Sequence, residues 1–144
     1  MAVLRENPYG EFNFLVDLGT GETEGPEAGF QHVSGLAQEV EVIEYRNGND
    51  KVNSVRKLNG LTKVPDVTLK RGIMGSLALY QWLRDGSTRT VRIQLQNEDR
   101  SATVMAWTLL RARPVRQVHG PLDAKGGDVA MEELTLAYER LEIE

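Results

Sequence analysis

Apolar and polar residues alternate over most of the chain, a pattern that is typical of β-strands. Between positions 12 and 18, Phe12, Phe14, Val16 and Leu18 fall on one side of an extended segment. Side chains of a strand point alternately to the two faces of a sheet, so a period of two predicts a strand. Further extended segments are predicted at 30–33, 36–46, 67–70, 91–96, 102–110 and 131–143.

Polar residues, glycines and prolines separate these segments. Gly19, Gly21, Gly25 and Pro26 predict an exposed turn region after the first strand. Loops or turns are also predicted at 46–56, 97–100 and 123–128, and irregular extended chain at 114–121.

The period changes between residues 76 and 84, where the pattern predicts the single helix of the chain. Leu79 and Leu83 are four residues apart, and Trp82 is three residues after Leu79. This spacing places the three side chains on one helical face. Ser76 is a plausible N-cap, and the Asp85-Gly86 pair at 85–86 predicts the end of the helix.

The succession of strands with one helix predicts the fold class. We expect a mainly β protein, an antiparallel β-sandwich or barrel with one α-helix packed on it, formed by residues 1–144 as a single domain. The expected core residues are Val40, Val42, Leu79, Trp82, Leu83, Trp107, Leu134 and Leu136.

Composition and charge narrow the possible functions. The 144 residues include 17 basic and 21 acidic ones, and the net charge of −4 argues against wrapping of nucleic acid by a basic field. Without cysteine the chain has no disulfide and no thiolate site. No apolar run reaches the ~20 residues of a membrane span, so no membrane insertion is expected. The N-terminus lacks the apolar core of a signal peptide, so we expect synthesis in the cytoplasm.

Candidate catalytic, cofactor and metal sites are weak, and none is predicted. His32 and His119 have no metal-ligand spacing. Ser34 and His32 lie in one extended segment without an orienting third group. Residues 19–21 read GTG, but Glu24 stands where a dinucleotide loop has its third glycine. Alternating glutamates, including Glu132, are expected on solvated strand faces rather than in a catalytic pair. We therefore expect a protein that is not an enzyme.

The strands themselves suggest self-association. Exposed strand edges need cover, and a small strand-rich subunit has limited means to cover all of them internally. A head-to-tail contact between identical subunits makes a ring when its rotation closes. The residues alone thus indicate a candidate assembly subunit.

A series of motifs then resembles one known family. Residues 30–36 read FQHVSGL, 39–48 read EVEVIEYRNG and 67–72 read VTLKRG. Leu79 and Trp82 follow, then Trp107, RPV at 113–115, GPL at 120–122 and VAMEELTL at 129–136. Their order and spacing, from about residue 12 to 142, resemble the inner-tube proteins of contractile tails. Asn59 in the segment 56–61 (RKLNGL) replaces a proline that is usual in that family.

The resemblance implies a structural subunit of the inner tube of a phage tail, an R-type bacteriocin or an extracellular contractile injection system. Six subunits would form a homohexameric ring, and rings would stack inside a sheath into a hollow tube that delivers DNA or effectors. The implied partners are further copies of the chain, a sheath protein, baseplate or spike proteins, a terminator and the cargo. No cofactor is implied, and the product is an assembled particle.

The same resemblance implies that the 46–56 loop reaches neighbouring subunits. The residues expected at that interface are Arg46, Asn49, Asp50, Lys51, Arg56 and Lys57. Two alternatives remain open at this point: a secreted Hcp-type ring that acts as an effector chaperone of a type VI system, and a small-molecule-binding β-barrel.

Overall fold

The computed structural model describes residues 2–21 and 28–144. Gly25 and Pro26, on which part of the turn prediction rests, lie outside these residues, and so does Glu24, which argued against a dinucleotide loop. In chain order, the elements are β1 (Phe14–Asp17), β2 (His32–Ser34), β3 (Glu39–Tyr45), β4 (Arg56–Lys63), β5 (Val67–Gly72), α1 (Ala78–Asp85), β6 (Arg89–Gln96), β7 (Thr103–His119), β8 (Met131–Ala137) and β9 (Arg140–Ile143).

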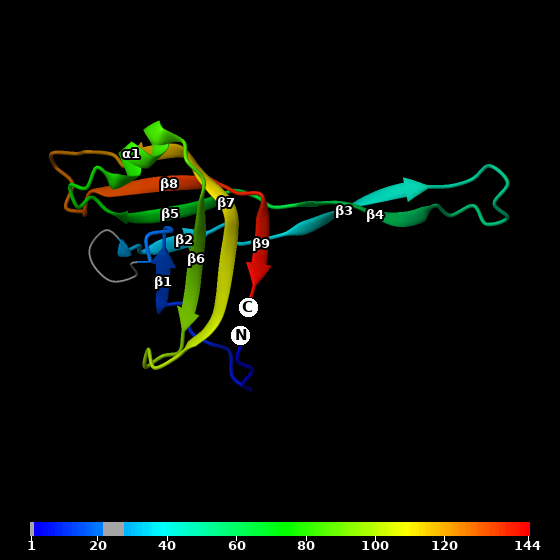
Figure 1. Cartoon of the computed structure of the whole chain (residues 1–144), viewed down its shortest axis with the longest axis horizontal. Helices are drawn as coiled ribbons and strands as arrows, with labels where there is room; N and C mark the ends of the chain where they lie inside the picture. Colours follow the sequence, from blue (N-terminus) through cyan, green and yellow to red (C-terminus); the bar gives the residue numbers. More distant parts are fainter. Residues whose placement is uncertain (1, 22–27) are drawn as a thin grey trace.

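The body of the protein is one continuous antiparallel sheet that folds over on itself. Its strands follow the order β1-β6-β7-β8-β5-β2, and β9 also pairs with β7. The long strand β7 forms the corner, since its first part pairs with β6 and β9 and its second part pairs with β8 (Figure 1). Arg111 has a positive φ of 55° at this corner, a conformation that suits a strand changing from one layer to the other.

The core lies between these two layers. Val67 and Leu69 of β5 and Leu134 and Leu136 of β8 are fully buried, as are Val91 and Ile93 of β6. Burial of each such side chain stabilises the fold by roughly 1.5–3 kcal/mol. A mainly β fold with one helix among the described residues is therefore confirmed.

Helix α1 packs on this core through Leu79 and Trp82, both of which are buried. The Trp82 indole N–H donates to the Ser87 carbonyl at 2.8 Å, so its polar edge is satisfied. The Ser76 hydroxyl accepts from the Ala78 N–H at 3.2 Å, but the N-cap position itself is Leu77. The predicted stop is confirmed, because Gly86 adopts a left-handed φ of 72° and its N–H donates to the Trp82 carbonyl at 2.9 Å.

Two core predictions are wrong. Val40 and Val42 are 49% and 54% exposed, because β3 lies outside the body and pairs only with β4 among the described strands. Leu83 and Trp107 are half-buried, and Trp107 packs against the edge of the core.

Three strand predictions also differ from the structure. Residues 56–63 form β4, a strand that the sequence pattern did not predict. The segment after Pro114 is not irregular but continues β7 to His119, with a register shift between Pro114 and Arg116. Such an irregularity accommodates a proline, which cannot donate to the ladder. The last predicted strand is divided into β8 and β9, which pair with successive parts of β7.

Candidate assembly surfaces

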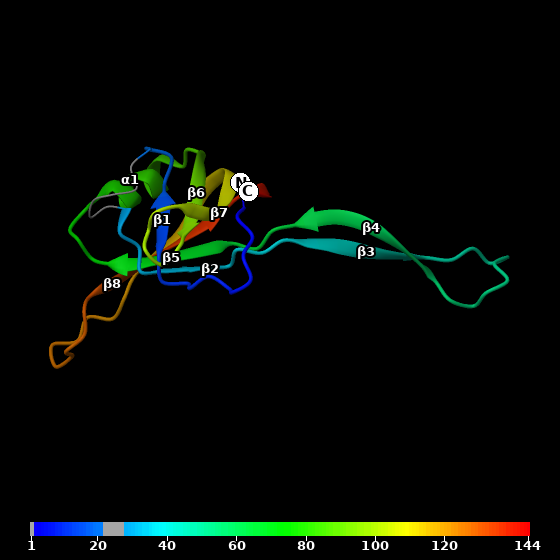
Figure 2. The ribbon, with the colours of Figure 1, turned by 90° about the horizontal axis from the view of Figure 1, so that it is seen from below.

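A hairpin arm, formed by β3 and β4 with the loop between them (residues 39–63), projects from the body in both views (Figures 1 and 2). Its two strands form a separate two-stranded sheet. At about 3.3 Å per residue, the eight residues of β4 alone extend roughly 26 Å. The arm therefore reaches well beyond the surface of the subunit.

The arm exposes apolar side chains on both faces. Every residue of β3 is exposed, and Val42 and Ile43 point to opposite faces because they are adjacent in the strand. The apolar residues exposed by 48–74% along the two strands are Val40, Val42, Ile43, Tyr45, Leu58 and Leu61. Six exposed apolar side chains gathered on one hairpin mark an interaction site, and an isolated two-stranded hairpin is only marginally stable in water.

The six residues predicted at a subunit interface all lie in or beside the arm tip (residues 46–57). Three of them contact one another: Arg46 donates to the Asp50 carbonyl at 3.1 Å, and Arg56 forms an ion pair with the Asp50 carboxylate at 3.2 Å. The other three, Asn49, Lys51 and Lys57, are exposed. Whether the six residues touch a neighbour remains a prediction.

An apolar groove of about 610 Å³ separates the two ends of the sheet path, β1 and β2. Its apolar lining includes Phe14, Val33, Leu36, Leu95 and Trp107. Trp107 is half-buried because it faces this opening. The sequence missed the groove, because its lining comes from four separate segments, residues 9–14, 31–36, 93–95 and 107, whose convergence periodicity does not show.

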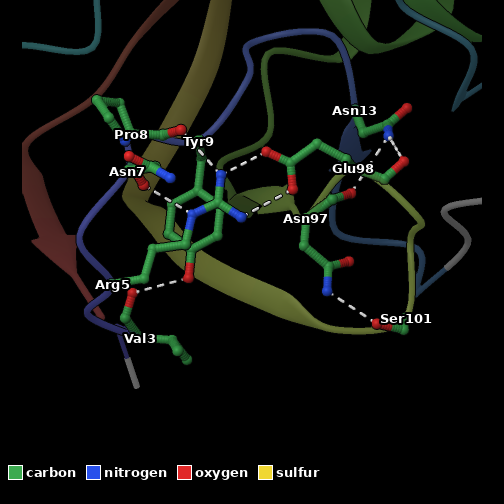
Figure 3. A network of polar contacts seen from close by, with 9 residues as sticks. All are labelled: Val3, Arg5, Asn7, Pro8, Tyr9, Asn13, Asn97, Glu98 and Ser101. Carbon is green, nitrogen blue, oxygen red and sulfur yellow. Dashed lines mark hydrogen bonds and ion pairs between the residues drawn. The ribbon is translucent and has the colours of Figure 1, made fainter.

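Figure 3 shows a network that fixes an N-terminal strap (residues 2–10) to the β6–β7 turn. Arg5 donates from Nη1 to Glu98 at 2.9 Å and from Nη2 to its other carboxylate oxygen. Arg5 also donates to the Asn7 and Pro8 carbonyls and lies over the Tyr9 ring at 3.7 Å. The hydrogen bond from Arg5 lowers the pKa of Glu98 to about 2.

The strap and the C-terminal strand together cover the outer edge of β7. β9 pairs with the segment from Trp107 to Leu110, and the Val3 N–H donates to the Val104 carbonyl at 2.8 Å further along the same edge. This edge of β7 is thus covered in part by the chain itself.

A buried ion pair joins the two strands of the second layer. Arg71 of β5 and Glu132 of β8 face each other across the ladder, and Arg71 Nε donates to Glu132 Oε1 at 2.6 Å. Both side chains are at most 4% exposed, so the expectation of a solvated Glu132 is wrong. His119 lies 3.4 Å from the other carboxylate oxygen and is itself more than half exposed.

The described residues contain no group of three or more potential metal ligands. Among the same residues, no helix has the length and apolar character that a bilayer span requires. The features that distinguish the described part of the chain are the projecting arm, the groove and the partly covered edge of β7.

Comparisons with known proteins agree with this interpretation. The family model of the T4-like virus tail tube protein gp19 matches residues 10–142. A chain in the cryo-EM structure of an extracellular contractile injection system, the PVC sheath-tube complex in the extended state, is 28% identical, with a TM-score of 0.83 over 96% of this chain and 93% of that one. A chain in the anti-feeding prophage (AFP) baseplate structure is 31% identical, with a TM-score of 0.81 over 97% of both chains.

A more distant likeness extends to Hcp1 from Flavobacterium johnsoniae, at 11% identity and a TM-score of 0.57 over 90% of this chain and 93% of that one. At that identity only the fold is shared. No curated protein sequence matches the chain significantly. The family match spans nearly the whole chain and gives it the role of a tube subunit in a contractile tail or injection system. The chain belongs to the family of the T4-like virus tail tube protein gp19.

Proposed function

We propose that the chain builds the inner tube as homohexameric rings that stack inside a sheath, and that it acts as one structural unit without catalytic activity. The observation that carries this proposal is the arm, whose apolar side chains are exposed on both faces and whose two strands pair only with each other among the described strands. A tube subunit needs such a surface, because each copy must hold its neighbours firmly.

The energetics favour a contact with identical copies. Covering the remaining exposed surface of six half-exposed apolar side chains stabilises the assembly by roughly 1 kcal/mol for each. A contact between the arm of one subunit and the body of the next is heterologous, because the two surfaces differ. Heterologous contacts close into rings or continue as filaments, and a stacked tube uses both.

Partners follow from the relatives that contain similar chains. Those relatives are a sheath-tube complex, a sheath/tube terminator and a baseplate. We infer that this chain likewise meets a sheath protein along its length, and a baseplate or spike and a terminator at its two ends. The hollow axis then serves as the conduit for DNA or protein effectors.

The test is the assembly state of the purified protein with and without an intact arm surface. Wild-type protein is expected to form rings and tubes under negative-stain microscopy. The V42D/I43D variant, which places a carboxylate on each face of the arm, is expected to remain monomeric with an unchanged circular dichroism spectrum. The matched control is L122D/V129D, which alters two exposed apolar residues of the body and is expected to assemble.

Three outcomes would contradict the proposal. Tubes formed by V42D/I43D at the protein concentrations at which wild type assembles would show that assembly does not require the apolar faces of the arm. A wild-type protein that is monomeric at every concentration and binds small apolar molecules in the groove would favour a binding barrel. Single rings that never stack would favour an Hcp-type ring.

A further inference from the structure

We propose that Asn47 in the arm tip is a modification site, at which the folded tip speeds the deamidation of its own asparagine, and that the modified copies are excluded from assembly. The chemistry concerns the isolated subunit and needs no partner. Only the consequence for assembly rests on the proposed function.

The reaction joins the Asn47 side chain to the backbone nitrogen of Gly48. Hydroxide removes the proton of the Gly48 N–H, and the nitrogen attacks the Asn47 side-chain carbonyl carbon, so that a new C–N bond forms. The bond from that carbon to Nδ2 then breaks, and ammonia leaves with a proton taken from water. Water opens the resulting succinimide ring to give aspartate or isoaspartate at position 47. Hydroxide and water are the only co-reactants, and no group is oxidised or reduced.

The sequence contains two Asn-Gly pairs, at 47–48 and at 59–60. Glycine after asparagine favours ring closure, because it has no Cβ to hinder the attacking nitrogen and its backbone is free to turn. Gly48 lies in the tip, where it is exposed, and a Cβ built on it would meet no atom of the described chain within 4 Å. Water and hydroxide therefore reach its N–H.

The second pair lies in a different environment. Asn59 is a residue of β4 and pairs with Val42 in the ladder with β3. A Cβ at Gly60 would lie 3.1 Å from the Glu41 carbonyl oxygen, so this glycine is packed against the partner strand. The ladder holds the Asn59-Gly60 backbone extended and restricts the rotation that ring closure needs. The structure thus distinguishes two identical dipeptides.

Tyr45 activates the Asn47 side chain. The Tyr45 O–H donates a hydrogen bond to Asn47 Oδ1. Negative charge develops on that oxygen when the Gly48 nitrogen attacks, and a donor that is already in place stabilises it. Tyr45 is the last residue of β3 and pairs with Arg56 of β4, so the hairpin itself fixes the donor.

The turn that follows holds the Asn47 backbone and supplies positive charge. The Asp50 N–H donates to the Asn47 carbonyl at 3.1 Å, and the Asp50 carboxylate accepts from the Asn47 N–H at 3.0 Å. Arg46 donates to the Asp50 carbonyl at 3.1 Å, and Arg56 donates to its carboxylate at 3.2 Å. Two cations thus surround the turn against one carboxylate, which favours an anionic intermediate.

The product changes the shape of the tip. Isoaspartate lengthens the main chain by one methylene and moves the carbonyl that accepts from the Asp50 N–H, so the turn is lost. Aspartate places a second carboxylate beside that of Asp50. A copy whose tip is already covered by a neighbour is protected from hydroxide, so the modification accumulates on copies that have stayed unassembled.

The first test follows the dispersed subunit at alkaline pH, folded and in urea. Peptide mapping by mass spectrometry measures the conversion at Asn47 and Asn59 in the same sample. In the folded protein Asn47 is expected to react about tenfold faster than Asn59, because only Asn47 is positioned for ring closure. In urea the two rates should converge, and that of Asn47 should fall. A folded-state rate at Asn47 below its rate in urea would overturn the proposal.

The variant Y45F tests the hydrogen-bond donor. It keeps the ring and removes the hydroxyl, so deamidation at Asn47 is expected to slow roughly threefold while the rate at Asn59 stays the same. The matched control is Y9F, since the Tyr9 hydroxyl bonds to the Val3 carbonyl in the strap. Equal rates at Asn47 in Y45F and Y9F would refute the activation by Tyr45.

The last test concerns assembly. Partly deamidated protein is allowed to form tubes, which are sedimented, and the fraction modified at Asn47 is measured in pellet and supernatant. We expect the pellet to be depleted at least about threefold in modified copies. Equal fractions in pellet and supernatant would refute the exclusion. If wild type forms no tubes at all, the proposed function fails, whereas the rates at Asn47 in the dispersed subunit still decide the modification site.

Discussion

Gly35 lies directly against the backbone carbonyl of Asp66 at the root of the arm. A Cβ at position 35 would lie 2.3 Å from that oxygen, and Gly35 has a φ of +93° that L side chains rarely adopt. Gly35 follows β2 and Asp66 precedes β5, so the chain leaves for the arm and returns from it at one point. This close approach fixes where the arm joins the body.

Substitution G35A is therefore expected to destabilise the subunit. The left-handed backbone alone costs roughly 1–3 kcal/mol, and the clash with Asp66 adds to that cost. The free energy of unfolding from urea titration measures the effect on dispersed subunits. G48A is the matched control, because Gly48 has open space around it and no positive φ. Equal stability of G35A and G48A would show that the root tolerates a side chain.

The N-terminal strap is expected to loosen in acid. The folded-state pKa of Glu98 is lowered from its ordinary value of 4.5 to about 2 by the hydrogen bond from Arg5. A lowered folded-state pKa stabilises the strap fully above pH 4.5, and the contribution is lost as the pH falls toward 2. Carbon-detected NMR titration of the Glu98 carboxyl should give a midpoint near 2 in wild type. R5A should return the midpoint toward 4.5, whereas a midpoint near 4.5 in wild type would refute the strap contact.

The buried pair of Arg71 and Glu132 is expected to tolerate joint replacement better than the loss of one partner. R71M leaves a buried carboxylate without its main counter-charge, which costs about 3–5 kcal/mol. The R71M/E132L double variant should recover a large part of that loss, because no buried charge remains. Thermal unfolding measures both variants.

An exposed pair supplies the control for that comparison. Arg140 and Glu142 are well exposed, so R140M should change the unfolding free energy by at most about 1 kcal/mol. If R71M has an unfolding free energy no lower than that of R140M, water must reach the Glu132 carboxylate, and the pair is not buried as described.

The sequence predicted well those elements whose side-chain periodicity alone shows which face is buried. Leu79 and Trp82 occur at helical spacing, and the helix that presents them ends at Gly86 as expected. Leu134 and Leu136 alternate with polar residues, and they face the core from β8. In these cases the period of the side chains and the side that is buried follow from the same few residues.

The sequence failed where the burial of a side chain, or the pairing of a strand, depends on residues far away in the sequence or on another molecule. Val40 and Val42 alternate just as Leu134 and Leu136 do, and periodicity does not tell whether the same subunit covers them. β4 escaped prediction because Asn59 and Gly60 interrupt its apolar pattern, although pairing with β3 holds it extended. The buried position of Glu132 depends on Arg71, which lies 61 residues earlier in the chain.

The candidate site shows the same division. The polar composition of 46–56 predicted a loop, and residues 46–55 do connect β3 to β4. The internal bonds of Asp50 and the projection of the arm from the body required the three-dimensional structure. The sequence therefore located the loop but did not show which of its residues bond to one another.

A cryo-EM reconstruction of the assembled protein tests most directly whether the arm joins the copies. We expect a tube of stacked six-membered rings in which Val42 and Ile43, each about half exposed in the isolated subunit, are buried against a neighbouring copy. A tube in which both faces of the arm remain in solvent would contradict the account.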